Sequence, residues 1–172
     1  MQFIEQVTVG SGGAASITFS NIPQEGFTDL LLVWSGRSSF SDVVVDPQVS
    51  FNGSSANFTG RRLFGTGANV FSDSTARRIS ADPGATATAN TFSNGQLYIP
   101  NYRSSVAKSF STDAVGENNG TTAYQMITAG LWNDTSAITT IALSYVAGNF
   151  VQHSTASLYG VTAGSDGIVT VS

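Results

Sequence analysis

Apolar and polar residues alternate along much of this chain with a period of two, the spacing of a β-strand that buries one face. Between residues 137 and 146 the pattern is clean at Ile141, Leu143 and Tyr145. Ile138 falls out of register with them, which predicts a β-bulge near residues 139–140. The spacing typical of an amphipathic helix is nearly absent. The chain is therefore predicted to be built from strands.

Strand-like segments rich in Val, Ile, Thr, Phe and Tyr recur between Gly-rich breaks, such as Asn52-Gly53, that favour tight turns. This organisation predicts an all-β fold, a single antiparallel β-sandwich of jelly-roll type, in one domain over residues 1–172. The predicted strands are 3–9, 14–22, 28–37, 48–52, 57–64, 68–71, 96–100, 106–115, 124–132, 137–146 and 155–161.

The segment 28–37 is apolar on both faces. Leu30, Leu32 and Trp34 share one face, and Leu31 and Val33 lie on the other. A strand covered on both sides is central in a sandwich or packs against another subunit, so both interpretations stay open.

Residues 72–91 are polar and rich in Ala, Ser and Thr, with Asp82-Pro83-Gly84 near their centre. This composition predicts a long surface excursion. Loops of that length in compact domains are often functional.

Composition and charge narrow the classes of function. The chain has 172 residues, of which 41% are hydrophobic and 10% are charged, against about 25% charged in an ordinary domain. This apolar fraction argues against disorder. The net charge of -4 argues against binding to nucleic acid. No apolar run is long enough for a membrane helix, so no membrane partner is predicted.

No catalytic, metal-binding or cofactor-binding set is predicted, and the chain is not expected to be an enzyme. His153 is the one histidine and cysteine is absent, so a zinc site lacks its ligands. A histidine in this context, without a nucleophile elbow, is more often a surface or loop residue than a catalyst. The aspartates follow no calcium-loop or glycosidase pattern: Asp42, Asp46, Asp73, Asp82, Asp113 and Asp134.

Two arginine pairs stand out in a chain with so few charges, Arg61-Arg62 and Arg77-Arg78. Neighbours in a strand point to opposite faces, so one of Arg61 and Arg62 is predicted to meet solvent. The other is predicted to reach an acid at a subunit boundary; plain surface charge is the equal alternative. Phe71, beside polar residues, is a further interface candidate, or a ring tucked under its own sandwich.

Several segments carry a resemblance to a known family. They are 130–141, beginning Gly130-Leu131-Trp132, 147–154, 17–23 leading into 30–32, and 156–161. Together they resemble small bacteriophage virion structural proteins of cyanophage-like type. The resemblance implies a β-sandwich on the outer surface of a phage particle, made in the host cytoplasm. It also implies a homotrimer whose partner is the major capsid protein or another virion protein.

Within that resemblance, the favoured hypothesis is a capsid decoration or cement protein that clamps neighbouring capsid subunits. Residues 1–9 and 72–91 are the candidates for contact with the shell. The alternative is a tail or fibre-tip protein that binds host glycan on an aromatic platform. Trp132 with Asn133 and Asp134, or Tyr102 with its neighbours Asn101 and Arg103, is the predicted platform. A polysaccharide depolymerase is the least favoured hypothesis.

Overall fold

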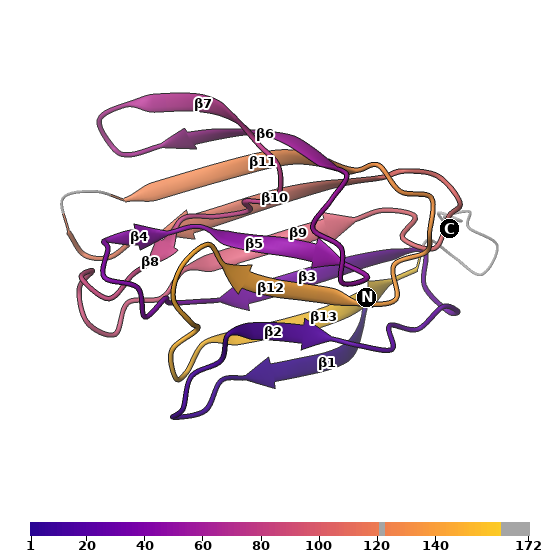
Figure 1. Cartoon of the computed structure of the whole chain (residues 1–172), viewed down its shortest axis with the longest axis horizontal. Coiled ribbons are helices and arrows are strands. Elements are labelled where there is room, and N and C mark those ends of the chain that lie inside the picture. The colour runs from indigo at the N-terminus through magenta and orange to yellow at the C-terminus, as the bar shows by residue number, and fades with distance from the viewer. Residues whose placement is uncertain (121–122, 163–172) are drawn as a thin grey trace, which may run out of the picture.

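The computed structural model describes residues 1–120 and 123–162, and it confirms the predicted all-β, sandwich-type fold (Figure 1). A large antiparallel sheet forms one layer. In spatial order it contains β1 (Gln2–Thr8), β13 (Thr155–Val161), β3 (Asp29–Ser35), β9 (Asn94–Ile99), β10 (Lys108–Gly116), β11 (Tyr124–Trp132), β6 (Phe58–Gly65) and β7 (Val70–Thr75).

A smaller layer lies across one face of the large sheet (Figure 1). It contains a three-stranded sheet and a short two-stranded one, whose strands are β2 (Ser16–Phe19), β12 (Ile141–Tyr145), β5 (Pro47–Phe51), β4 (Val44–Val45) and β8 (Asp82–Pro83). The chain crosses between layers from β1 to β2 to β3, and again from β11 to β12 to β13. Greek-key sandwiches use such crossings, and the jelly-roll subtype remains a prediction.

The core lies between the two layers because strands of both layers, such as β10, β11 and β12, alternate buried with more exposed positions. Its most densely aromatic part joins Phe51 of the small sheet to Phe58, Phe110 and Trp132 of the large one, with ring centroids 5.4 to 5.8 Å from Phe51. These tilted and edge-on ring contacts hold the small sheet over β6, β10 and β11.

Two core rings lie over glycines on the neighbouring strand. Trp34 pairs with Gly95 and Phe110 with Gly130, and a Cβ at either glycine would overlap the ring opposite. Glycine is needed at these positions because the cross-strand ring occupies the space of its missing side chain.

The central position of β3, between β13 and β9, confirms one of the two interpretations of segment 28–37. Leu31 and Val33 point away from the small layer and remain half-buried. The predicted bulge near residues 139–140 is wrong. Ile138 lies before β12, where it is fully buried and its N–H donates to the carbonyl of Tyr102.

The segment 72–91 is not a surface excursion throughout. Its first residues belong to edge strand β7, and Ile79 to Pro83 are buried. Hydrogen bonds between Val49 and Arg77 and between Ile79 and Pro47 add residues 77–79 to the free edge of β5. The hydroxyl of Thr112 on β10 also donates to the Ile79 carbonyl, so this stretch widens the small layer over the large sheet.

Two basic side chains are buried and bonded to backbone carbonyls. Arg37 donates to the carbonyls of Ala85, Ala87, Thr88 and Thr91, and thereby ties down the exposed end of the 72–91 segment. Lys108, the one lysine, is 1% exposed. It donates to the carbonyl of Val106, close in the chain, and to that of Ser136, in the loop after β11. Burial lowers the pKa of both groups.

Asp82, on β8 of the small layer, carries a fully buried carboxyl group. Its oxygens accept hydrogen bonds from the hydroxyls of Ser80 and Tyr145, each at 2.8 Å. Burial outweighs these bonds and raises the pKa of Asp82 from 3.8 to about 6. The folded state therefore holds this proton more tightly than the unfolded chain.

Asp82 gives a testable pH dependence. Its raised pKa favours the folded state fully below pH 3.8, and this contribution is lost as the pH rises through about 6. For Asp82→Asn, which stays neutral, the free energy of unfolding relative to the native chain should rise by about 2–3 kcal/mol between pH 4 and pH 8. Denaturant unfolding across that range measures it. The exposed Glu25→Gln is the control, and an Asp82→Asn curve parallel to the native one would contradict the assignment.

Candidate functional site

The face of the large sheet that points away from the small layer, here called the outer face, is uncovered among the described residues. Strand register places its side chains in rows across the sheet. One row contains Arg61, Ala129 and Ser111 on β6, β11 and β10, and the next contains Leu63, Ile127 and Asp113 on the same strands. Hydrogen bonds between the strands therefore fix where the side chains of the outer face lie relative to one another.

Aliphatic side chains gather at the β6–β11 end of this face. Leu63, Val70 and Ile127 are 45%, 74% and 51% exposed, and Ala129 lies beside them. These four residues are called the aliphatic patch. Exposed apolar residues are ordinary singly, but clustered on neighbouring strands they are typical of a binding surface.

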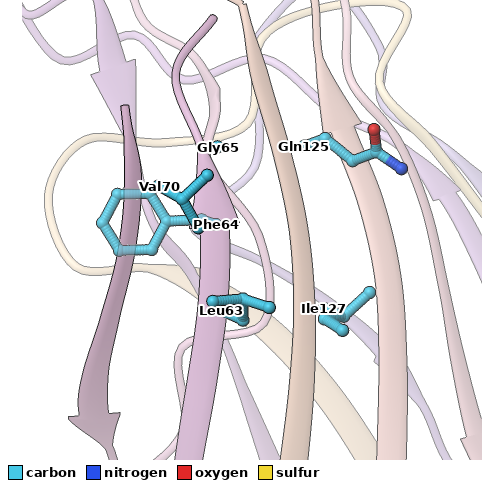
Figure 2. A pocket seen from close by; sticks show the side chains of 6 residues that line it. All are labelled: Leu63, Phe64, Gly65, Val70, Gln125 and Ile127. Atoms are coloured by element: carbon cyan, nitrogen blue, oxygen red, sulfur yellow. The ribbon is translucent and has the colours of Figure 1, made fainter. Parts of the chain in front are cut away.

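The patch is hollowed in two places. The first depression, about 230 Å³, is shown in Figure 2, where Leu63 and Ile127 lie at the same level on neighbouring strands. It is also lined by Phe64, Gly65, Val70 and Gln125. The second, about 600 Å³, extends over Ala129 to small residues on both sides, Ser72 and Ser111. The patch thus offers both projecting side chains and hollows beside them.

Charged residues lie at two opposite corners of the patch. Arg61 on β6 and Asp113 on β10 flank β11 and stand in consecutive rows. Both are exposed, and neither forms an ion pair with any residue in the described part of the chain. The prediction that one arginine of the 61–62 pair meets solvent is confirmed for Arg61.

A second apolar group lies at the far end of the outer face. Phe3, 56% exposed, packs edge-on against Tyr159 at 5.9 Å, in the same row as Leu31 and Tyr98. The Tyr98 hydroxyl donates to Asp29 at 2.5 Å, and this carboxylate raises the pKa of Tyr98 to about 12. Polar residues of β10 separate this group from the aliphatic patch.

Arg62 points the other way, and its predicted role at a subunit boundary is corrected. Its guanidinium binds both oxygens of Asp73 on β7, at 2.6 and 2.9 Å, and Asp46 between β4 and β5 at 3.2 Å. All three residues belong to this chain. The ion pairs lower the pKa of Asp73, and they tie the edge strand β7 to the small layer.

The second arginine pair also bonds within the chain. Arg78 reaches Asp46 at 3.1 Å, and Arg77 donates to the side chain of Gln48 and the carbonyl of Val49. Phe71 stacks on Phe64 at 5.3 Å yet stays 47% exposed. Of the predicted interface residues, Arg61 and Phe71 are therefore the more available to a partner.

The predicted glycan platform is wrong in both versions. Trp132 is 1% exposed and packs in the aromatic core, while Tyr102 is fully buried with its hydroxyl on the Pro23 carbonyl. Neither ring can stack on a sugar. Asn133 is exposed, and the Asp134 carboxylate accepts the Ser136 N–H, so both belong to the loop that follows β11.

His153 lies in an exposed turn, as the sequence predicts, with a φ of 74° and its N–H donating to the Val9 carbonyl. Across the described ranges, no three His, Asp or Glu side chains come together as a metal-ligand set. The same residues contain no helix long and apolar enough to cross a membrane.

Sequence reasoning missed the aliphatic patch, although its signal is present. Like segment 28–37, segments 57–64 and 124–132 carry apolar residues on both faces, with Leu63 and Ile127 opposite the core positions. Apolar residues on the second face of an antiparallel strand indicate a further contact.

Comparisons with models of known protein families, with curated proteins and with solved structures give no match to this chain. The proposal for its function therefore rests on the resemblance described above, the fold and the outer face.

The Arg62 network predicts a large difference between neighbouring arginines. Arg62→Met should lower the free energy of unfolding by about 1–3 kcal/mol, because it leaves Asp73 without its cation and Asp46 with Arg78 alone. It should also reduce hydrogen-exchange protection along β7. Arg61→Met, measured at a concentration that keeps chains apart, should change stability by no more than about 0.5 kcal/mol. Equal effects of the two substitutions would contradict the network's role.

Proposed function

We propose that this protein is a structural component of a bacteriophage particle: a capsid decoration or cement protein, acting as a homotrimer, that clamps neighbouring major capsid subunits from outside. The observation that carries the proposal is the uncovered outer face, with exposed aliphatic side chains held in register on hydrogen-bonded strands. Such a surface fits assembly with another protein. The virion, the capsid position and the trimer come from the resemblance of the segments described above.

The physical properties of the chain suit this role. A particle component must be rigid, and the two layers are joined by aromatic packing, the Arg62 ion pairs and the Arg37 carbonyl contacts. A clamp needs only modest contacts from each subunit, because linked copies bind with a high effective concentration. The negative net charge keeps such a protein away from nucleic acid.

A second candidate function, host-glycan binding at a tail or fibre tip, keeps one supporting observation. Phe40 and Phe71 are 44% and 47% exposed, and exposed aromatic rings can stack on sugars. With Trp132 and Tyr102 buried, this candidate ranks below the capsid role.

Purified particles of the phage that encodes the chain test the proposal. Cryo-electron microscopy should show this sandwich across the shell lattice, and quantitative mass spectrometry should find on the order of hundreds of copies per particle. Shells lacking the protein should rupture at lower temperature than complete shells. Absence from the particle, or on the order of a dozen copies at the tail, would contradict a capsid role.

A further inference from the structure

We propose that the aliphatic patch binds the same patch of a second copy of this chain, in a face-to-face pair whose two-fold axis passes over β11. This inference rests on the proposed function, in that the protein works by assembly, and it names the partner of the outer face. The contact joins copies two at a time. A trimer would close through other surfaces of the chain.

The apolar content of the patch supports a buried partner. Leu63, Val70 and Ile127 expose about half or more of their surface, although Leu63 and Ile127 lie in strands whose opposite face is in the core. Burying such side chains is worth roughly 25 cal/mol per Å² of apolar surface removed from water. A second sheet stacked on the patch would bury them as the small layer buries the inner face.

The charged residues beside the patch favour a second copy of this chain as that partner. Arg61 and Asp113 stand on opposite sides of β11 and one row apart, so they occupy diagonal corners around Ile127 and Ala129. A two-fold axis that lies in the plane between two facing copies, above this centre and perpendicular to the line from Arg61 to Asp113, places Arg61 of each copy opposite Asp113 of the other. One arrangement therefore makes two ion pairs between chains from side chains that make none within the described chain.

The relief of the patch leaves room for a partner. The patch carries projecting side chains, Leu63 and Ile127, and a depression of about 600 Å³ beside them over Ala129 and Ser111. An isologous contact requires a surface that is complementary to itself, and the charges around the patch meet that requirement.

Size-exclusion chromatography with light scattering, together with sedimentation equilibrium, tests the pair on the whole chain. The native protein should form dimers, or hexamers if a trimer also closes, and Ile127→Asp should halve the mass. Val146→Asp is the matched control, because Val146 is an aliphatic residue of similar exposure, 45%, directly after β12 and outside the patch. It should leave the mass unchanged.

The ion pairs are tested by charge exchange. Arg61→Asp and Asp113→Arg should each weaken pairing by about tenfold or more, because each places like charges opposite one another. The double variant should recover most of the native affinity. Circular dichroism spectra matching the native chain show that each variant is folded, which keeps a change in mass attributable to the contact.

Three results would overturn the pair: a native monomer at every concentration, a mass unaffected by Ile127→Asp, or a double variant no better than the single ones. A monomer whose Ile127→Asp variant no longer binds particles would assign the patch to a different protein and also overturn it. A chain that pairs as described but is absent from particles would contradict the proposed function alone. A chain that decorates shells without pairing would contradict this inference alone.

Discussion

The width of the large sheet is the constraint on which the rest of the structure depends. Its eight strands have one face to bury, and the three strands β2, β12 and β5 that lie on that face cannot cover all of them. Aromatic packing around Phe51 fills the middle of the interface. At the β6–β7 end, ion pairs and backbone hydrogen bonds cover the inner face instead, because an inner face left in water would lose its hydrophobic stabilisation.

Several of these contacts are made by the few charged side chains of the protein. Arg62 joins the edge strand to the small layer through two aspartates, and residues 77–79 extend the edge of β5 over β10. Arg37 and Lys108 are buried against backbone carbonyls, where they satisfy acceptors in loops that have no strand partner. Three of the seven basic residues, Arg37, Arg62 and Lys108, are thus buried within the fold. The cationic surface available to a nucleic-acid partner is correspondingly small.

The outer face of the large sheet differs from the inner face. Nothing in the described chain covers it, yet its strands carry aliphatic and aromatic side chains at positions where a solvent-facing sheet normally carries polar ones. The proposed capsid decoration and the proposed pairing of copies would each cover such a face. The two proposals differ in the partner that covers the face. The outer face has two apolar groups, one around Ile127 and one around Phe3, so it has room for more than one contact.

The strand content and most strand positions follow from the sequence alone, because side-chain alternation is a local property that needs no partner to be recognised. The double-sided apolar pattern of segment 28–37 left two interpretations open, and the sheet order chose the central strand. The sequence also located the turn at Asn52-Gly53, where both residues have positive φ. Long-range pairing was decided by the tertiary structure alone. Which face of a strand meets the core, and which acid meets Arg62, depend on contacts between segments far apart in the chain. For the same reason the alternative hypothesis of a glycan platform chose Trp132 and Tyr102, which are core residues. The patch around Ile127 became visible only when register placed β6, β11 and β10 side by side.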